Sequence, residues 1–250
     1  MAGVLDGKVA LVTGAGRNIG RAIALHLARD GAAVVVNGRA DHAAVAAVAA
    51  EIIATGGQAI ACLADVTDPA AVAAMVDAAA GRFGGIDIAV SNAGLRRQTP
   101  FRDMRLEEWR EILAVALDGA FILAQAVVPH MVRRGGGALI GLSGISTHVG
   151  TPNRAHVSAS KAGLEGLMRA LAVELAPHGI RCNCVAPGTI DTVRGASAGA
   201  QPGTVAVGGV PLGRRGSVDE IAAVVRLLAG PEGGYITGQT IHVNGGLFLT

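Results

Sequence analysis

A glycine-rich segment, TGAGRNIG at residues 13–20, has the spacing to bind a phosphate through backbone groups. Gly14 and Gly16 permit a tight turn, and Gly20 lets a helix start close against the strand before it. The segment directly follows the first apolar run, KVALVT, and a helical pattern over residues 19–30 overlaps its end. Exposed N–H groups at such a helix start can hold a pyrophosphate, so the pattern predicts a dinucleotide site rather than a glycine turn without a ligand.

Basic side chains surround the expected position of the dinucleotide's ribose. The second apolar run ends in Asn37 and Arg39, and Arg17 lies in the glycine-rich turn. An acidic residue at the strand end would bond the ribose 2′-hydroxyl of NAD, whereas converging guanidinium groups suit a 2′-phosphate. We therefore expect NADP as the cofactor, with NAD less favoured. The alternative is that the two arginines are solvated surface residues that bind no ligand. Asn18 occupies a turn position where glycine would fit, and asparagine tolerates left-handed backbone.

Short β-branched runs alternate with long alanine-rich stretches along the whole chain. The expected strands cover residues 8–13, 32–37, 58–65, 86–92, 137–143 and 180–186, with a last strand near 239–243. The expected helices cover residues 19–30, 41–57, 68–84, 106–134, 155–177 and 218–229, with Asp68 as an N-cap. This alternation predicts an α/β fold, a single-domain Rossmann fold over residues 1–250 with a doubly wound, seven-stranded parallel sheet and helices on both faces.

The composition excludes several classes of protein. Of 250 residues, 51% are hydrophobic and 16% are charged, so a sizeable core is expected and disorder is not. A net charge of +2 and 2% aromatic residues favour neither a nucleic-acid nor a membrane partner. We see no uninterrupted apolar run of about 18 residues and no basic start followed by an apolar stretch, so neither a membrane span nor a secretion signal is expected. The three cysteines then favour a reduced, cytoplasmic setting.

Residues 193–216 are the one shift in composition. The segment VRGASAGAQPGTVAVGGVPLGRRG is rich in glycine and alanine and lacks aromatic residues. A loop of this length inside a compact domain is typical of an active-site lid or of a mobile connection. We expect a flexible substrate lid.

Several motifs together resemble the short-chain dehydrogenase/reductase family, and are most similar to its β-ketoacyl-acyl-carrier-protein reductase branch and to sugar-acid dehydrogenases. The glycine-rich turn resembles the family's TGxxxGxG motif with its middle glycine replaced. ADV (64–66) resembles its adenine-contacting segment, SNAG (91–94) its NNAG motif, and VAPGTIDT (185–192) its segment beside the nicotinamide. YITGQTIHVNGG (235–246) resembles its C-terminal strand. The cofactor residues that follow from the turn and the resemblance are Gly14, Gly16, Arg17, Asn18, Ile19, Gly20, Asn37, Arg39, Asp65, Val66, Asn92, Ala93, Gly94, Lys161, Pro187, Gly188, Ile190 and Thr192.

The family's catalytic set of Asn, Ser, Tyr and Lys is only partly matched. The Tyr-x-x-x-Lys motif matches Val157 to Lys161, so the lysine is present and the tyrosine is not. The segment EWREILAVALDGAF, which carries the family's Asn, has Ala116 at the matching position. Counting back to the family's Ser reaches Gly144, with Ser143 beside it. The resemblance implies that Tyr donates the proton while Lys lowers the pKa of Tyr and bonds the nicotinamide ribose. Valine can do neither.

Carbonyl reduction needs a proton as well as a hydride, so a missing phenol requires another donor. The resemblance places His148 in a loop over the nicotinamide, and imidazole titrates in a suitable range, although a loop histidine can simply be solvated. Ser143 could orient the carbonyl if the extra residue before Val157 shifts the register. His156 points off the catalytic face of its helix, so we expect it to be packed. The one tyrosine, Tyr235, takes a structural position by resemblance. The candidate catalytic residues are Lys161, Ser143 and His148.

Two other pairs of residues have alternative interpretations. Cys182 and Cys184 alternate on one strand face, but no second cysteine pair and no HExxH spacing accompanies them. We expect packed core thiols and no metal site. Arg96 and Arg97 follow SNAG near the expected substrate mouth, where they either attract a carboxylate or phosphate or stay solvated.

Two functions fit the sequence. The first is an NAD(P)-dependent oxidoreductase, nominally a carbonyl reductase or alcohol dehydrogenase, with an atypical active site. Its substrate would be a small-molecule ketone or alcohol, or an acyl thioester. The alternative is a non-catalytic homologue that binds the cofactor and acts as a partner subunit or a sensor. The resemblance implies a homotetramer assembled through residues 106–134 and 155–177.

Overall fold

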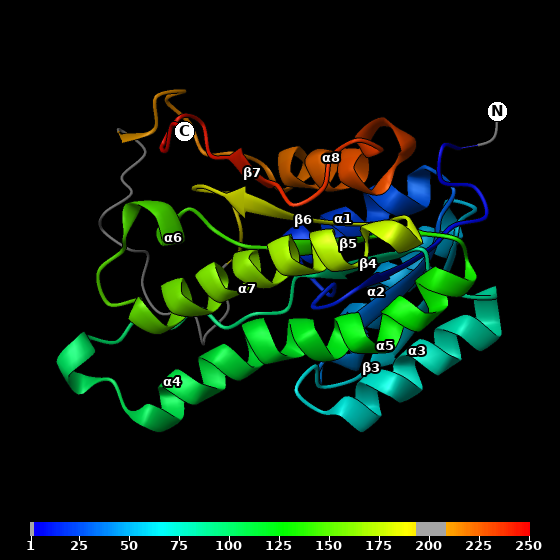
Figure 1. Ribbon diagram of the computed structural model, residues 1–250, viewed down its shortest axis with the longest axis horizontal. Helices are drawn as coiled ribbons and strands as arrows, with labels where there is room; N and C mark the ends of the chain where they lie inside the picture. Colours follow the sequence, from blue (N-terminus) through cyan, green and yellow to red (C-terminus); the bar gives the residue numbers. More distant parts are fainter. Residues whose placement is uncertain (1–2, 194–208) are drawn as a thin grey trace.

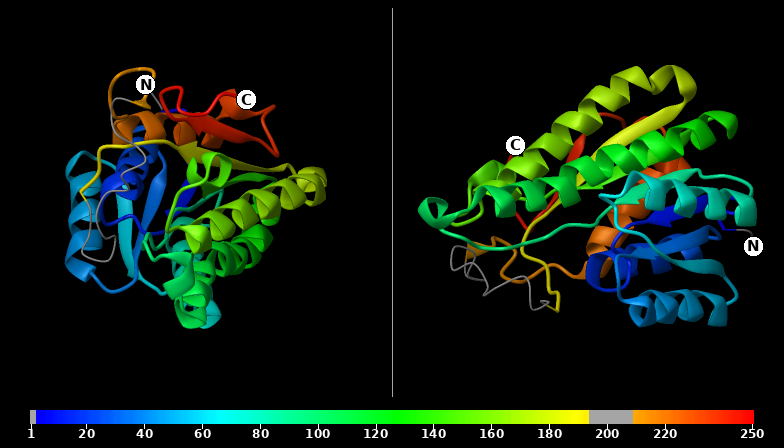
Figure 2. Two further views of the ribbon diagram at one scale, coloured as in Figure 1. Left: turned by 90° about the vertical axis from the view of Figure 1, so that its left-hand side faces the viewer. Right: turned by 90° about the horizontal axis from the view of Figure 1, so that it is seen from below.

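Seven parallel strands form one sheet in the order β3-β2-β1-β4-β5-β6-β7. The computed structural model describes residues 3–193 and 209–250. The strands are β1 (Val9–Val12), β2 (Ala33–Gly38), β3 (Gln58–Leu63), β4 (Ile88–Ser91), β5 (Gly137–Leu142), β6 (Ile180–Pro187) and β7 (Thr240–Val243). Helices cover both faces of the sheet (Figures 1 and 2). The predicted doubly wound parallel sheet of seven strands is therefore confirmed.

The helices follow the expected alternation. They are α1 (Asn18–Arg29), α2 (His42–Ala54), α3 (Pro69–Phe83), α4 (Leu106–Leu113), α5 (Gly119–Arg133), α6 (Ser146–Val149), α7 (Ala155–Glu174) and α8 (Val218–Ala229). Short 3₁₀ turns lie at Phe101–Asp103, Ala176–His178 and Pro231–Gly233, and a π-helical turn lies at Ala114–Asp118. The predicted N-cap is confirmed, because the Asp68 carboxylate accepts the N–H groups of Ala70 and Ala71 at 2.9 and 3.2 Å.

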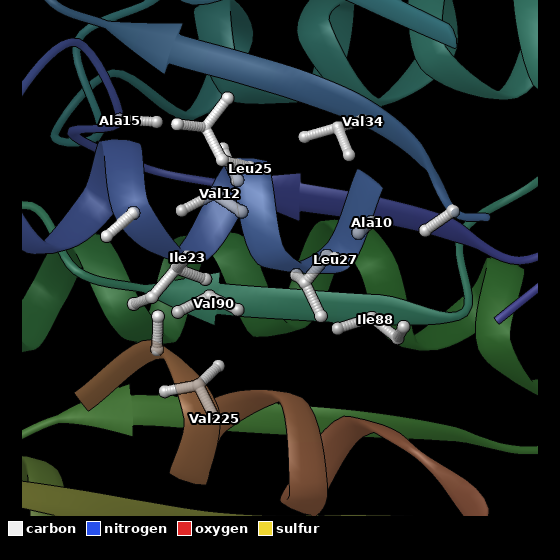
Figure 3. Packing of buried hydrophobic residues seen from close by; sticks show 14 of the residues in the cluster. Ala10, Val12, Ala15, Ile23, Leu25, Leu27, Val34, Ile88, Val90 and Val225 are labelled. Atoms are coloured by element: carbon white, nitrogen blue, oxygen red, sulfur yellow. The ribbon is translucent and has the colours of Figure 1, made fainter. Parts of the chain in front are cut away.

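The hydrophobic core has two layers, one on each face of the sheet. Successive strand residues point to opposite faces, so Ala10 and Val12 belong to the layer under α1, α2 and α8. Val9 and Leu11 belong to the layer under α3, α5 and α7. Figure 3 shows the first layer, where Ile23 of α1 packs with neighbouring strand and α8 side chains. Burial on both faces explains why the strands read as continuous apolar runs.

The stretch from α4 through the π-helical turn to α5 forms one helical segment, Leu106–Arg133, which matches the helix expected over residues 106–134. Leu106–Arg133 is long and apolar enough, by length and composition, to cross a membrane, with a mean hydropathy of 2.0 in its most apolar window. One face of this segment serves the core, since Leu123, Val127 and Met131 are buried against the sheet and α3.

Residues 194–208, most of the expected lid, lie outside the described residues. The flanking chain is described on both sides, and Ile190 forms an isolated parallel bridge with Gly216. The described chain before and after the segment is therefore paired at Ile190 and Gly216, beyond the carboxyl end of β6.

Replacing Gly20 with alanine should destabilise the protein, because an added Cβ would lie 2.4 Å from the Gly14 carbonyl oxygen and 2.5 Å from the Asn92 amide nitrogen. We expect Gly20→Ala to lower the free energy of unfolding by about 1–3 kcal/mol. Gly81 is an exposed glycine in α3 with nothing within 4 Å of an added Cβ. As a control, Gly81→Ala should raise the free energy of unfolding by about 0.5–1 kcal/mol. Urea unfolding measures the free energy of unfolding of both variants. Equal changes in the two variants would contradict the close approach at Gly20.

Candidate active site

A cleft of about 480 Å³ follows the carboxyl ends of the strands, at the point where the strand order reverses between β1 and β4. Open α/β sheets bind ligands at this edge, and the volume suits a ligand of cofactor size. The predicted site residues on its wall are Gly14, Arg17, Asn18, Ile19, Gly20, Asn37, Arg39, Asp65, Val66, Asn92, Ala93, Gly94, Ser143, Lys161, Pro187, Gly188, Ile190 and Thr192. Gly16 faces α2 instead, since an added Cβ would lie 3.2 Å from the Cβ of Ala44.

Hydrogen bonds from the segment after β4 hold the glycine-rich turn. Thr13 Oγ1 accepts the N–H groups of Asn92 and Ala93 at 3.0 and 3.1 Å. The Asn92 side-chain amide donates to the carbonyls of Thr13 and Gly14 at 2.9 and 3.0 Å. Gly14 has a φ of +61°, which favours glycine. The turn that starts α1 is therefore fixed by the SNAG segment as well as by its own sequence.

Asn18 ties the glycine-rich turn to the chain that leaves β6. Its φ is +51°, so the asparagine adopts the left-handed backbone expected at this position. Its side-chain amide donates to the Val193 carbonyl at 2.8 Å, and its oxygen accepts the Val193 N–H at 3.0 Å. A glycine could supply the backbone conformation but neither of these bonds.

At the other end of the turn, Asn37 supports the wall. Its buried amide donates to the carbonyls of Gly38, Cys62 and Ala64 at 3.3, 3.3 and 3.1 Å, which joins the ends of β2 and β3. Arg39 follows β2 with an exposed side chain. The sequence prediction placed both residues at the ribose, and both line the cleft. Because the Asn37 amide already makes these bonds, Arg39 has the freer side chain for a ligand.

Asp65 is held as a carboxylate on the same part of the wall. The Thr67 backbone N–H, at 3.0 Å, lowers the pKa of Asp65, and the Thr67 hydroxyl at 2.8 Å and the charge of Arg39 act in the same direction. Its oxygens can accept a hydrogen bond from an amino or hydroxyl group of a ligand.

Lys161 lies on α7 in the other half of the cleft, against the end of β5. Its Nζ donates to the Leu142 carbonyl at 2.5 Å. Burial, followed by the positive charge of Arg96, lowers the pKa of Lys161 to about 8. Gly94 keeps the space beside the ammonium open, since an added Cβ would lie 3.6 Å from Nζ. The ammonium is thus positioned for a ligand hydroxyl or phosphate.

Aliphatic side chains form the wall near Lys161. Val157, one helical turn before Lys161, is 4% exposed and lines the cleft. Ala116 is buried in the π-helical turn, and its neighbour Val115 lines the cleft. π-helical turns often occur at functional sites, and the sequence did not predict this one. Among the described wall residues there is no tyrosine, histidine or cysteine, and Asp65 is the one with a carboxylate.

Ser143 reaches the cleft wall and also contacts a buried carboxylate, Glu165 of α7. Its hydroxyl donates to Glu165 Oε1, and the Thr147 hydroxyl and His148 Nε2 contact the same oxygen at 3.3 and 3.1 Å. His148 therefore lies in a short helix behind Ser143, and not in a loop over the cleft as the sequence suggested. Sequence reasoning missed Glu165, although its position four residues after Lys161 places both on one helix face.

Four further residues that the sequence singled out lie outside the cleft wall, namely His156, Cys182, Cys184 and Tyr235. His156 is fully buried, accepts the Val157 N–H at 2.9 Å and contacts Glu108 at 3.3 Å, so its packing is confirmed. Cys182 and Cys184 are buried in the core, and burial raises the pKa of each thiol to about 12. Tyr235 is fully exposed.

Two arginines line the cleft near Val157. Arg96 lies on the wall, whereas the neighbouring Arg97 forms an ion pair with Glu111. Arg154 also lines the cleft and was not predicted from the sequence. The sequence signal that could have identified Arg154 was its position, just before the start of α7 and three residues before Val157. The end of the cleft beside Val157 is therefore cationic.

The chain matches a known protein family and curated relatives over nearly its full length. Residues 14–248 match the family model described as Enoyl-(Acyl carrier protein) reductase. The 3-oxoacyl-[acyl-carrier-protein] reductase of Synechocystis sp. is 41% identical over 246 residues, covering 98% of each protein. The 3-oxoacyl-[acyl-carrier-protein] reductase FabG of Escherichia coli (strain K12) is 39% identical over 246 residues, also covering 98% of each.

Solved structures share the fold closely. A 7α-hydroxysteroid dehydrogenase complexed with NADH and 7-oxo glycochenodeoxycholic acid has a TM-score of 0.91 and 34% identity, covering 97% of this chain and 94% of the other. A short-chain type dehydrogenase/reductase from Mycobacterium marinum has a TM-score of 0.89 and 39% identity, covering 98% and 97%. At this identity the likeness extends beyond the fold to the sequence.

The lowered pKa of Lys161 predicts that binding of a dinucleotide in this cleft weakens as the pH rises through about 8, because the ammonium then becomes a neutral amine. The loss should be about tenfold, the size of one hydrogen bond to a charged group. Fluorescence titration at pH 6.5 to 9.5 would measure it. Lys161→Arg should remove this pH dependence, since guanidinium stays charged. The chain has one other lysine, Lys8, and Lys8→Arg is the control that should keep it. If the pH profile of binding were unchanged in Lys161→Arg, Lys161 would not be the group whose titration weakens binding.

Proposed function

The chain belongs to the short-chain dehydrogenase/reductase family, and on this premise we propose that it is an NADP-dependent oxidoreductase. It reduces a ketone, either small or carried on an acyl thioester, or oxidises the corresponding alcohol. The observation that carries the proposal is that the glycine-rich turn and Lys161 line one cleft at the point where the strand order reverses. The relatives named as 3-oxoacyl-[acyl-carrier-protein] reductases support the thioester class.

The cleft residues fit a nicotinamide dinucleotide. At Gly14 an added Cβ would lie 3.1 Å from the Cα of Ala93, and Gly20 has no room for one, so glycine at both positions lets the turn pack closely against the SNAG segment. In the proposed arrangement the turn holds the pyrophosphate, Asp65 and Val66 hold the adenine, and the segment from Pro187 to Thr192 lies beside the nicotinamide. The cleft's length along several strand ends supports this extended arrangement.

A bound nicotinamide supplies hydride to, or accepts it from, the carbonyl carbon. The protein's residues position the reactants. Lys161 bonds the ribose hydroxyls, which fixes the ring relative to α7. The Ser143 hydroxyl bonds the substrate's carbonyl oxygen. Val157 and Leu142 supply apolar surface that limits water beside the reacting carbon.

Val157 and Ala116 make this active site atypical within the proposed function. Valine and alanine cannot donate a proton, so the family's phenol and its asparagine have no counterpart at these positions. This joint absence is also the observation that favours the second candidate function, a non-catalytic homologue that binds the cofactor as a partner subunit or sensor.

Arg39 supports NADP over NAD. Its exposed guanidinium follows β2, next to the wall position where a ribose would lie, and Arg17 lines the turn. Both can bond a 2′-phosphate. The competing cofactor is NAD, because one solved relative is described as complexed with NADH.

We also propose a cytoplasmic homotetramer assembled through the long helices. Apolar side chains are exposed on these helices, namely Leu106 of α4, Phe121 and Val132 of α5, and Val173 of α7. In both figures α5 and α7 run side by side at one side of the molecule (Figures 1 and 2). Burying these side chains against another copy would remove apolar surface from water.

Val157→Tyr should increase the rate of NADPH oxidation with 3-oxoacyl thioesters and simple ketones by about 10- to 100-fold, since it places a phenol one turn before Lys161. Val157→Phe is the matched control, because it adds the ring without the hydroxyl and should give no gain. Absorbance of NADPH measures the rates. If neither the natural protein nor Val157→Tyr turned over any ketone or alcohol, the oxidoreductase proposal would be wrong, and calorimetric binding of NADPH would then favour the non-catalytic candidate.

Arg39→Gln should weaken NADPH binding by about 10- to 100-fold, the size of one or more lost charged hydrogen bonds, while NADH binding stays nearly unchanged. Arg29→Gln is the control, since Arg29 is exposed at the far end of α1. Titration calorimetry with both cofactors separates the two outcomes. Equal effects of Arg39→Gln on NADPH and NADH would contradict a 2′-phosphate contact.

A further inference from the structure

A hydrogen-bonded path leads from the cleft to the protein surface through a buried carboxylate. Ser143 lines the cleft and donates to Glu165 Oε1. His148 Nε2 lies 3.1 Å from that same oxygen. The Glu165 side chain is 5% exposed and the His148 side chain is 21% exposed, so the path ends where solvent can reach it. Both contacts share Oε1, so a proton that Oε1 receives from His148 leaves from the same oxygen once its O–H bond has turned toward Ser143.

The surroundings of Glu165 suit a group that changes its protonation state. Burying a carboxylate is costly unless it is paired. Its Oε1 contacts are two hydroxyls, of Ser143 and Thr147, and the His148 imidazole. Its Oε2 lies 3.9 Å from Arg169, whose own side chain is 57% exposed. The nearest ion-pair partner of Glu165 among the described residues is therefore the His148 imidazole in its protonated form.

Other titratable and charged groups face this carboxyl group from the elements packed against it. Lys161 and Arg169 lie on the same helix, α7. Cys184 of β6 interacts with Glu165, and its thiol stays neutral because burial raises its pKa to about 12. His242 of β7 stacks edge-on against His148 with ring centroids 4.5 Å apart, and burial lowers the pKa of His242.

Aromatic contacts fix the orientation of the His148 ring. The rings of Phe248 and His242 lie 5.0 and 4.5 Å from it, so it is held between them and Glu165. The neutral state of His242 avoids a second positive charge beside an imidazolium at His148. The ring that contacts Glu165 is thus held in place without competition from a charged neighbour.

We propose that Ser143, Glu165 and His148 form a proton relay that takes the place of the missing phenol, an inference that rests on the proposed function. In the reduction, the carbonyl carbon forms a C–H bond with hydride from NADPH, which is oxidised to NADP⁺. The carbonyl oxygen forms an O–H bond with the Ser143 proton, Ser143 regains a proton from protonated Glu165, and Glu165 regains one from the His148 imidazolium. His148 is reprotonated by solvent. Ser143 is the catalytic residue, and Glu165 and His148 act through it.

Alcohol oxidation runs along the same path in reverse. The alcohol proton passes to Ser143 as the Ser143 proton passes to the Glu165 carboxylate, and His148 releases a proton to solvent. Reduction requires protonated Glu165, so its rate falls as the pH rises. Oxidation requires the carboxylate, so its rate falls as the pH is lowered.

The test compares Glu165→Gln with Glu174→Gln, a matched change at an exposed residue at the end of the same helix. Glu165→Gln keeps the size of the side chain but cannot relay a proton. We expect it to lower kcat by about 10²–10⁴-fold and to remove the pH dependence of kcat, while Glu174→Gln changes neither. Saturating NADPH keeps the titration of Lys161 out of the profile. His148→Gln should give a smaller loss that added imidazole partly reverses.

A second readout does not depend on activity. The difference between infrared spectra of the natural protein and of Glu165→Gln, recorded as the pH is lowered, should contain one protonated carboxyl band, because the other acidic residues contribute to both spectra. The band should shift on transfer to D₂O, and the shift should be slower in His148→Gln. A spectrum of Glu165→Gln identical to that of the natural protein would overturn the relay.

The outcomes separate the relay from the proposed function. If the natural protein turns over ketones but Glu165→Gln retains kcat and pH profile within about twofold, the relay is wrong and the oxidoreductase stands. If no ketone or alcohol is turned over, the proposed function is wrong and the relay with it. Thermal melting checks that Glu165→Gln is folded. If it unfolds, Ser143→Ala replaces it, with the same loss of kcat and of pH dependence expected.

In a Val157→Tyr background the restored phenol should make Glu165 dispensable. In that background Glu165→Gln should lower kcat by less than about tenfold, which corresponds to roughly one lost hydrogen bond. A loss as large as in the natural protein would show that Glu165 supports the structure rather than the proton path, and would overturn the relay.

Discussion

The hydrogen bonds between Thr13 and the Asn92–Ala93 segment join the two halves of the sheet where its order reverses. They bring the ends of β1 and β4 together, and the side chain of Asn92 closes over the backbone of the turn. A parallel sheet that reverses here must leave a crevice at its carboxyl edge, since the helices that follow β1 and β4 lie on opposite faces. The cleft, the glycine-rich turn and the position of Lys161 across from it all depend on this junction.

The half of the cleft beside α7 combines a cation with apolar surface. Lys161 lies among Val157, Leu142 and Val115, and the absence of a phenol among the described wall residues leaves Ser143 as the hydroxyl that connects to a buried ionisable group. A single face of α7 carries Val157, Lys161 and Glu165 at intervals of four residues, so one helix sets the positions of an apolar wall residue, the ammonium group in the cleft and the buried carboxyl group.

Local signals in the sequence predicted the fold well. The helix expected at 218–229 matches α8, because Ser217 and Glu220 form a capping box and Gly230 follows its end. The π-helical turn at Ala114–Asp118 and the short helix α6 were not predicted, since both depend on packing between distant segments. The same holds for Glu165: its spacing from Lys161 was visible, but its bond to Ser143 depends on how β5 and α7 meet. The assignment of Arg39 to a ribose stays a prediction.

The cleft carries a marked imbalance of charge within a protein whose net charge is only +2. Arg17, Arg39, Arg96, Arg154 and Lys161 line it, against the carboxylate of Asp65 among the described wall residues. Walls of low polarisability focus the field of such a cluster outward, so an anionic ligand is steered toward the opening before contact. Encounter with a multiply charged dinucleotide is therefore favoured over that with a neutral metabolite, and dissolved salt, by screening this attraction, slows capture without altering the contacts made afterwards.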